Sequence, residues 1–352
     1  MNSRRTILFI FWIAAAWTGG SYVYALDKER NAPLVIQEQG SFATGGTVTI
    51  DVEGHPFHGD HAYVFYQKPV HSRQYPIVFL HGIHQASKTW ETTPDGREGF
   101  QNIFLRRGFS TYNMTLPRRG NAGRGQVGME VKPMYDEQSW YTKWRIGIYP
   151  DYFDGVQFAR DEESLNQFMR QMVPETGPTD FEMNAGVVAE LFDKLGGGIL
   201  MSHSQGVMHT WKILPKTHNV KAVVALEGGG YFSFPTDATR PQTDAEEGLE
   251  YIMVSPDTFK AFTQVPILLI YGDNIPTEPN DIYELDVWRI RLDLARQWAE
   301  AVNRRGGDVT LIHLPEIGIK GNTHFPMSDL NNVEVADVIS RWLHEKKMDL
   351  EL

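Results

Sequence analysis

The segment Ser202-His203-Ser204-Gln205-Gly206 places a hydroxyl group where an apolar run gives way to a helix-forming run. A serine on a tight strand-to-helix turn projects its Oγ above the edge of a sheet, and small neighbours relieve the crowding of that turn. The segment departs from the usual Gly-x-Ser-x-Gly pattern because Ser202 replaces the first glycine, although serine is also small. The sequence therefore predicts that Ser204 is a nucleophile rather than part of an ordinary polar turn.

A serine nucleophile requires a general base, and the base requires an acid that orients it. In proteins with this turn, the nucleophile, the acid and the histidine follow one another along the chain in that order. His324 lies in the segment 321–326, between the last expected strand and the last expected helix. His313 lies within an expected strand, where a packing role is the simpler interpretation. We therefore predict that His324 is the base.

Two carboxylates are candidates for the acid, and each follows an expected strand. Glu227 ends the run 222–226 and precedes three glycines, whereas Asp273 ends the next strand. Both lie at the carboxyl edge of a parallel sheet, where active sites of such folds gather. The glycines permit the loop after Glu227 to approach a histidine closely, so Glu227 is favoured and Asp273 is the alternative acid.

A tetrahedral oxyanion formed by serine attack needs backbone donors. His81-Gly82-Ile83 follows the first core strand, which is where a turn of this kind finds one donor. The second donor is the residue after the nucleophile. We assign the backbone N–H groups of Ile83 and Gln205 to this oxyanion hole, and we interpret His81 as a brace of the loop.

Three histidines outside this group raise the question of a metal site. His55, His58 and His61 recur every three residues, with Asp60 nearby. They are far from Ser204 in the sequence and match no recognised spacing of metal ligands. We interpret them as a polar turn. The sequence therefore implies no metal, and hydrolysis by a serine requires no cofactor.

From Tyr75 onward, apolar strands alternate with amphipathic helices, which predicts parallel α/β units. The expected strands are 47–52, 62–67, 77–80, 110–116, 198–201, 222–226, 265–271 and 309–314, and the expected helices are 99–107, 184–195, 206–214, 285–304 and 333–346. Two insertions, 121–178 and 231–263, interrupt the alternation. The first is rich in Gly, Pro and aromatic residues, so it is interpreted as a lid or binding loop or, equally, as an aromatic core packed on the scaffold.

The composition and the N-terminus bear on location and partners. Residues 1–25 combine a basic start, a short apolar run and Val23 and Ala25 at signal-peptidase spacing, which predicts a cleaved signal peptide and a secreted or periplasmic protein. A single domain would then span 26–352. The apolar run is shorter than the ~20 residues of a membrane span, so no membrane association is expected after cleavage. The net charge of -11 argues against nucleic-acid binding.

The region from Tyr75 to His344 resembles the α/β-hydrolase superfamily. The segment 90–97, the turn at 202–206, Glu227, and His324 with Asp329, Asn331 and Asn332 resemble a small group of secreted bacterial serine carboxylesterases. In that group the acid is a glutamate after the sixth strand. The resemblance therefore implies an α/β-hydrolase fold with a mostly parallel central sheet, and it supports Glu227 as the acid.

Together these features predict a carboxylesterase that forms an acyl-enzyme on a small-molecule ester, with apolar or aromatic groups favoured by the aromatic insertion. A lactonase or an amidase would use the same residues. A dehalogenase or epoxide hydrolase would need a carboxylate nucleophile, which Ser204 excludes. A catalytically silent binding protein of the same fold is the alternative from another class. The oligomeric state does not follow from the sequence.

Overall fold

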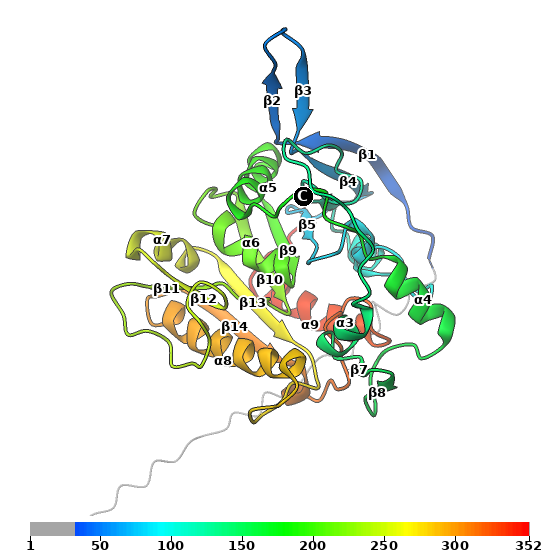
Figure 1. Ribbon diagram of the computed structural model, residues 1–352. Coiled ribbons are helices and arrows are strands. Elements are labelled where there is room, and N and C mark those ends of the chain that lie inside the picture. The colour runs from blue at the N-terminus through cyan, green and yellow to red at the C-terminus, as the bar shows by residue number, and fades with distance from the viewer. Residues whose placement is uncertain (1–31, 352) are drawn as a thin grey trace, which may run out of the picture. The chain divides into compact units, whose positions relative to one another are not determined.

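A mostly parallel sheet of eight strands organises the chain, in the order β1-β4-β6-β5-β9-β10-β13-β14 (Figure 1). Its strands are β1 (Ile36–Thr44), β4 (Ala62–Pro69), β5 (Ile77–Leu80), β6 (Thr111–Thr115), β9 (Gly198–His203), β10 (Val220–Leu226), β13 (Pro266–Tyr271) and β14 (Asp308–His313). Strands β5 to β14 of this sheet pair in parallel, whereas β4 is antiparallel to both β1 and β6. The α/β fold class predicted from the sequence is confirmed.

The computed structural model describes residues 32–351, and residues 35–351 belong to one unit of the chain. The predicted signal peptide at 1–25 lies outside the described residues. The helices are α2 (Phe100–Arg106), α3 (Glu137–Lys143), α4 (Glu162–Arg170), α5 (Phe181–Leu195), α6 (Gln205–Ile213), α7 (Pro256–Lys260), α8 (Tyr283–Asn303) and α9 (Asn332–Glu345), with short 3-10 turns at Ser87–Trp90, Ala261–Thr263 and Leu314–Ile317. Within the described range, none of them has the length and apolar character needed to cross a bilayer.

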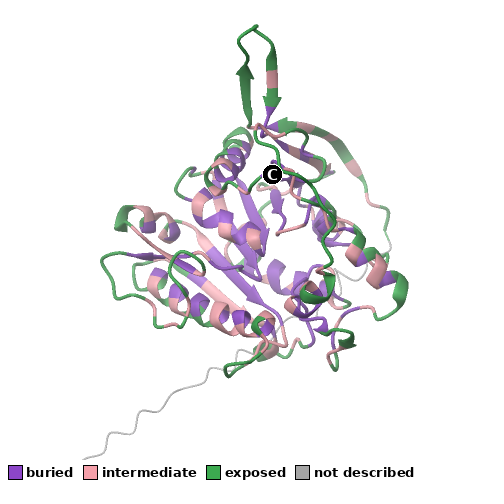
Figure 2. Cartoon of the chain, in the orientation of Figure 1, coloured by how far each residue is buried: buried purple, intermediate pink, exposed green. Residues whose placement is uncertain are grey.

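Helices cover both faces of the sheet because successive residues of its buried strands point to opposite sides. Val78 and Leu80 of β5 belong to a core cluster with residues of α5, α6 and α8. Ile77 and Phe79 of the same strand belong to a second cluster with residues of α2 and α9. The buried centre of the molecule therefore follows the sheet (Figure 2).

Two N-terminal features differ from the expectation. The expected strand 47–52 does not join the main sheet, because β2 (Thr47–Ile50) pairs only with β3 (Pro56–Gly59) in a hairpin that projects away from it (Figure 1). Strand β1 was not expected at all. It lies at the edge of the sheet and most of its residues are exposed or half-buried, so its sequence lacks the apolar run of an interior strand.

The insertion 121–178 contains α3, α4 and the short strands β7 (Gly147–Ile148) and β8 (Asp151–Tyr152). Its aromatic side chains Tyr141, Trp144 and Phe168 are buried and join the core cluster that includes α9. Phe325, one residue after His324, lies in the same cluster and stacks edge-on against Trp144, with the ring centroids 5.2 Å apart. The insertion is thereby packed directly on the segment that carries the expected base.

The second insertion, 231–263, begins with β11 (Phe232–Pro235), which pairs in parallel with β12 (Tyr251–Val254) outside the main sheet. Phe232 packs against Trp211 of α6, with ring centroids 5.9 Å apart, and against Trp298 of α8 at 5.8 Å. The Trp298 indole N–H donates to the Ser233 carbonyl. This insertion therefore extends the core on the face that α6 and α8 cover.

Candidate active site

Ser204 forms the turn between β9 and α6. Its φ of 53° and ψ of -118° lie in a region that non-glycine residues seldom adopt, which is the strain expected of a nucleophile turn. A side chain at Gly206 would clash, because a Cβ there would lie 2.7 Å from the Leu80 carbonyl oxygen. The Ser202 hydroxyl, which replaces the usual glycine, accepts a 2.9 Å hydrogen bond from Thr210 of α6. The turn thus forms with serine at its first position.

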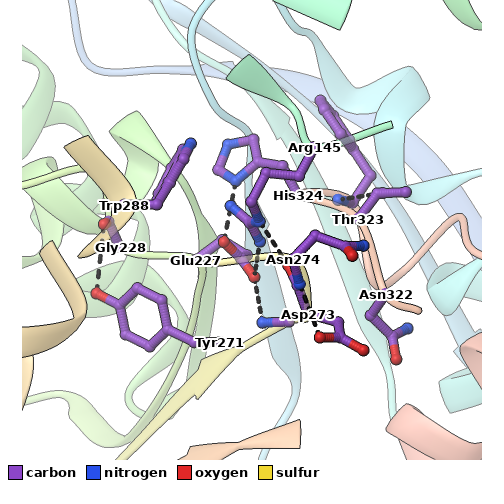
Figure 3. Close-up of polar contacts among 12 residues, drawn as sticks. Arg145, Glu227, Gly228, Tyr271, Asp273, Asn274, Trp288, Asn322, Thr323 and His324 are labelled. Carbon is purple, nitrogen blue, oxygen red and sulfur yellow. Dashed lines mark hydrogen bonds and ion pairs between the residues drawn. The ribbon is translucent and has the colours of Figure 1, made fainter. Parts of the chain in front are cut away.

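Glu227 and His324 lie in contact at the carboxyl edge of the sheet. His324 Nδ1 is 3.2 Å from Glu227 Oε2, and both side chains are buried (Figure 3). Glu227 follows β10 directly and has a φ of 55°. Its other oxygen, Oε1, accepts hydrogen bonds from Arg145 Nη2 at 2.7 Å and from the Gly272 backbone N–H. Three donors therefore satisfy the two oxygens of this carboxylate.

Asp273, the alternative acid, has different partners. Its carboxylate accepts hydrogen bonds from the backbone N–H groups of Asn274 and Gly321, each at 2.7 Å. Its backbone carbonyl accepts a 2.8 Å hydrogen bond from Arg145 Nε. Asp273 therefore braces the start of the loop that carries His324, whereas the imidazole of His324 contacts Glu227.

His203 links the turn at Ser204 to the loop of His324. The His203 imidazole donates from Nε2 to the His324 carbonyl at 2.7 Å, since a carbonyl can only accept. The His324 backbone N–H donates in turn to the Trp144 carbonyl at 2.8 Å. Ser204 Oγ and His324 share no hydrogen bond in the described part of the chain. Catalytic contacts of this kind are often long before substrate binds and tighten when it does.

The surroundings of His324 keep its imidazole neutral. Burial lowers the pKa of His324 well below its usual value, and the nearby cations Arg145, Arg291 and Lys143 lower it further. A neutral imidazole at pH 7 is the form that can accept a proton. The ring of Trp288 lies 4.4 Å from the His324 ring between centroids, and its indole N–H donates to the Lys143 carbonyl at 2.6 Å (Figure 3).

The loop after β5 passes directly against Ser204. A Cβ at Gly82 would lie 2.9 Å from Ser204 Cβ, so only glycine permits this approach. Among the described residues, the Ile83 N–H donates to no backbone acceptor. Gln205 is the first residue of α6, so its N–H has no acceptor within the helix. Both expected oxyanion donors are therefore free to bind an oxygen atom.

His81 has the bracing role expected from the sequence. Its Nδ1 donates to the Gly82 carbonyl at 2.8 Å, and its Nε2 accepts from the Leu116 N–H at 3.1 Å. Burial lowers the pKa of His81 to about 3, so the ring is neutral and holds one tautomer. His81 therefore fixes the loop after β5 to the end of β6.

A buried polar network holds the loop that carries His324. Asp329 accepts hydrogen bonds from the Thr323 N–H and Oγ1, each at 2.8 Å, and from Asn322 Nδ2 at 3.0 Å. Burial raises the pKa of Asp329 to about 7. Asn331 Oδ1 accepts a second hydrogen bond from Asn322 Nδ2, at 2.7 Å. The side chains of Asp329 and Asn331 thus hold the residues that precede His324 in its loop.

The segment 90–97 supports the far end of the same loop. Trp90 is buried against Phe79 of β5, with ring centroids 4.9 Å apart. Arg97 donates to Asn332 Oδ1 at 2.9 Å and to the Ser328 carbonyl at 3.0 Å. Two of the stretches that carry the resemblance to secreted carboxylesterases, 90–97 and 324–332, therefore meet in space.

Two arginines at the site were not anticipated from the sequence. Arg145 comes from the insertion and reaches Glu227, and Arg119 from the loop after β6 donates to Gly82 and Gln205. Both are buried. Neither lies in a recognisable motif, and the only available signal was a cation within a stretch rich in Gly, Pro and aromatic residues.

One group of potential metal ligands lies away from this site. Ligand atoms of Asp51, Glu53 and His55, around the turn between β2 and β3, lie within 4.8 Å of one another. All three residues are exposed, and exposed acidic groups commonly cluster without an ion. Hydrogen bonds of the Asp51 carboxylate to the Glu53 and His55 N–H groups account for the arrangement as a turn.

The chain is similar to known proteins along most of its length. No family model matches it. It is 25% identical over 305 residues to "Probable secreted lipase phiG" of Fungal sp. (strain ATCC 74256), covering 78% of this chain and 83% of the fungal protein. It also superposes on the solved structure described as "The Atomic Resolution Structure of a Novel Bacterial Esterase" with a TM-score of 0.74 and 28% identity, over 90% of this chain and 98% of that one.

The order of the sheet, the turn at Ser204 between β9 and α6, and the match to a solved esterase along nearly its full length agree with one another. The chain belongs to the α/β-hydrolase superfamily.

Proposed function

We propose that this protein is a serine hydrolase that cleaves carboxylic esters through an acyl-enzyme, with Ser204, His324 and Glu227 as its triad. The observation that carries the proposal is the 3.2 Å contact of His324 with Glu227 beside the strained turn of Ser204. The fungal relative is named as a lipase and the bacterial neighbour as an esterase, which supports an ester as the substrate.

In the first half of the reaction, neutral His324 accepts the proton of Ser204 Oγ on Nε2 while Oγ forms a bond to the ester carbonyl carbon. The negative charge moves to the carbonyl oxygen, where the N–H groups of Ile83 and Gln205 stabilise it. The bond from carbon to the alcohol oxygen then breaks, and His324 returns its proton to the departing alcohol. The acyl group remains on Ser204.

In the second half, water takes the place of the alcohol. His324 accepts a proton from the water, whose oxygen attacks the acyl carbon, and the bond to Ser204 breaks as the serine regains a proton. Glu227 accepts the Nδ1–H of His324 throughout and stabilises the imidazolium that forms in each half. Arg145 and the Gly272 N–H hold the carboxylate in the orientation that this contact requires.

Aromatic side chains with partial exposure favour apolar or aromatic esters. The ring of Trp140 lies 5.1 Å from the ring of His84, which follows the oxyanion residue Ile83. On another element, Phe181 and Tyr231 are also 5.1 Å apart, and Tyr231 follows the glycines after Glu227. We expect kcat/KM to rise as the acyl group of a nitrophenyl ester is lengthened from acetyl to butyryl and benzoyl. Equal values across the series would argue against this preference.

A substrate panel separates the ester reaction from the lactonase and amidase alternatives. The purified protein would be assayed on matched esters, lactones and anilides, with Ser204→Ala as the blank for each. We expect the ester to give the highest kcat/KM and Ser204→Ala to abolish it. Hydrolysis only of lactones or anilides would reassign the reaction. Absence of turnover on all three by a folded protein would favour a binding protein of this fold.

We also propose that the protein is exported with cleavage after Ala25. The signal-like pattern of residues 1–25 supports this proposal, and so does the fungal relative, which is named as secreted. Expression of the full chain followed by N-terminal sequencing of the extracytoplasmic protein should give Leu26 as the first residue. A protein that keeps residues 1–25 in the cytoplasm would contradict export.

A further inference from the structure

Arg119 makes direct contacts with both halves of the proposed oxyanion hole. Its Nη1 donates to the Gly82 carbonyl at 2.9 Å, and its Nη2 donates to Gln205 Oε1 at 2.7 Å. The side chain is 3% exposed. These two acceptors belong to segments more than 100 residues apart in the chain, which follow the paired strands β5 and β9 and lie side by side at Ser204.

The Gly82 contact fixes the direction of the Ile83 N–H. In a trans peptide the C=O and the following N–H point in opposite directions, so the Gly82 carbonyl and the Ile83 N–H belong to one rigid plane. Arg119 and His81 both donate to this carbonyl, at 2.9 and 2.8 Å. The two donors hold the carbonyl at one edge of the peptide plane. The Ile83 N–H therefore points to the opposite edge, where it can bind an oxyanion.

The contact of Arg119 with the Gln205 side chain holds in place the residue whose backbone N–H is the second proposed oxyanion donor. Gln205 is the first residue of α6, and its side chain amide oxygen accepts from Arg119. The guanidinium is planar with donors in a fixed fork, so one group can set the separation of two acceptors. Because one planar guanidinium binds both acceptors, Arg119 holds the Gly82–Ile83 peptide and Gln205 at a fixed separation, and with them the Ile83 and Gln205 N–H groups.

The insertion anchors this guanidinium. Arg119 Nη2 also contacts Glu175 and lies 3.3 Å from Thr179 Oγ1. Backbone pairing between residues 119 and 175 adds a second connection. The neighbouring Arg118 is a natural comparison, because its guanidinium also forms a buried ion pair, with Asp60, and its one other hydrogen bond among the described residues goes to the Pro178 carbonyl.

We propose that Arg119 is a positioning residue that sets the geometry of the oxyanion hole. This inference rests on the proposed ester hydrolysis at Ser204. The loss of one oxyanion donor lowers kcat by roughly 100- to 1,000-fold in comparable sites, so misaligned donors should lower it by about 10- to 100-fold. The effect falls on kcat rather than KM because the oxyanion forms only after substrate has bound.

The test compares two matched substitutions, Arg119→Lys and Arg118→Lys. Each keeps a cation beside its carboxylate, but a lysine ammonium at 119 cannot reproduce the fork to Gly82 and Gln205. On a nitrophenyl ester, we expect Arg119→Lys to lower kcat by about 10- to 100-fold with KM changed less than about threefold. Arg118→Lys should retain wild-type kcat. Circular dichroism would verify that both variants are folded.

A second readout distinguishes positioning from general loosening of the fold. A trifluoromethyl ketone forms a tetrahedral adduct whose oxygen occupies the oxyanion hole, so its inhibition constant should rise in Arg119→Lys by the same factor as kcat falls. Wild-type kcat in folded Arg119→Lys, equal losses in both variants, or an unchanged inhibition constant would each overturn the inference. If the wild-type protein hydrolyses no ester and binds no ketone, the proposed function itself fails, which is a different result.

Discussion

Ser204 and Glu227 stand at the carboxyl ends of the neighbouring parallel strands β9 and β10, whereas Arg145 comes from the insertion 121–178, outside the main sheet. The sheet supplies the groups that would react, and the insertion supplies a cation that holds one of them. The same division recurs at the loop after β5, where Arg119 binds the Gly82 carbonyl and is itself contacted by Glu175 of the insertion. Irregular segments can therefore be as important for site geometry as the regular scaffold.

The two regions should respond differently to substitution. Removing a group supplied by the sheet deletes a chemical step, so the remaining activity should be near the background. Removing a supporting group from the insertion leaves every reacting group present but less well oriented.

The largest effect is expected for the reacting groups of the scaffold. Ser204→Ala and His324→Ala should each lower kcat by about 10⁴-fold or more, because neither half of the reaction can proceed without the nucleophile and the base. The double variant should lose little more than either single variant, since the two groups act as a unit. Initial rates on a nitrophenyl ester would measure this. A loss in the double variant equal to the product of the two single losses would contradict the proposed pairing of Ser204 with His324.

The carboxylates that follow β10 and β13 should differ in effect. Glu227→Gln should lower kcat by about 10²- to 10⁴-fold, because the imidazolium loses its counter-charge and the His324 tautomer is no longer fixed. Asp273→Asn should lower kcat less than about tenfold, since it braces a loop without touching the imidazole. The same ester assay compares them. A greater loss in Asp273→Asn would exchange the two assignments.

Arg145→Met tests the contribution of the insertion. Removing one partner of a buried ion pair leaves Glu227 with an unpaired charge, so the free energy of unfolding should fall by about 3–5 kcal/mol in urea titrations. The cation also lowers the pKa of His324, so its removal should raise that pKa. The acid limb of the kcat/KM profile should therefore move to higher pH. An unmoved limb in a folded variant would show that Arg145 does not act on the base.

The smallest effect is expected for Asp329, which holds the loop of His324 through buried hydrogen bonds. Burial raises the pKa of Asp329 to about 7 from its ordinary value near 4, so the folded chain binds a proton there that the unfolded chain has released. This group's contribution to the free energy of unfolding is therefore present below about pH 4 and decreases as pH rises to about 7. Between pH 5 and pH 8, the free energy of unfolding of the wild-type protein should fall by up to about 3 kcal/mol because of this group.

Urea titrations of Asp329→Asn over the same pH range should show a smaller fall in the free energy of unfolding. An equal fall in both proteins would contradict the raised pKa of Asp329.

The sequence was most informative where one local pattern determines the structure. Strand β5 and residues 198–201 of β9 are continuous apolar runs, and Ser204 lies in a strand-turn-helix pattern with its own steric requirement. Strand β1 escaped prediction because an edge strand buries few of its residues. Half-buried and exposed positions carry no clear apolar alternation.

The arrangement around the acid could not be read from the sequence in the same way. Glu227 and Asp273 both follow parallel strands, and strand periodicity does not specify which carboxylate faces the histidine. Arg145 reaches Glu227 because Trp144 and Phe325 pack together, which brings two segments that are 181 residues apart into contact. Such contacts depend on tertiary packing between segments with no shared motif.

Labelling with a fluorophosphonate probe, followed by peptide mass mapping, tests whether Ser204 is an activated nucleophile and requires no knowledge of the natural ester. The probe reacts with a serine only when a neighbouring base activates it. We predict one adduct on the peptide that contains Ser204, formed at a much lower rate in Glu227→Gln and absent in His324→Ala. An adduct on another residue, or an unlabelled Ser204 in a folded preparation, would contradict the proposed triad.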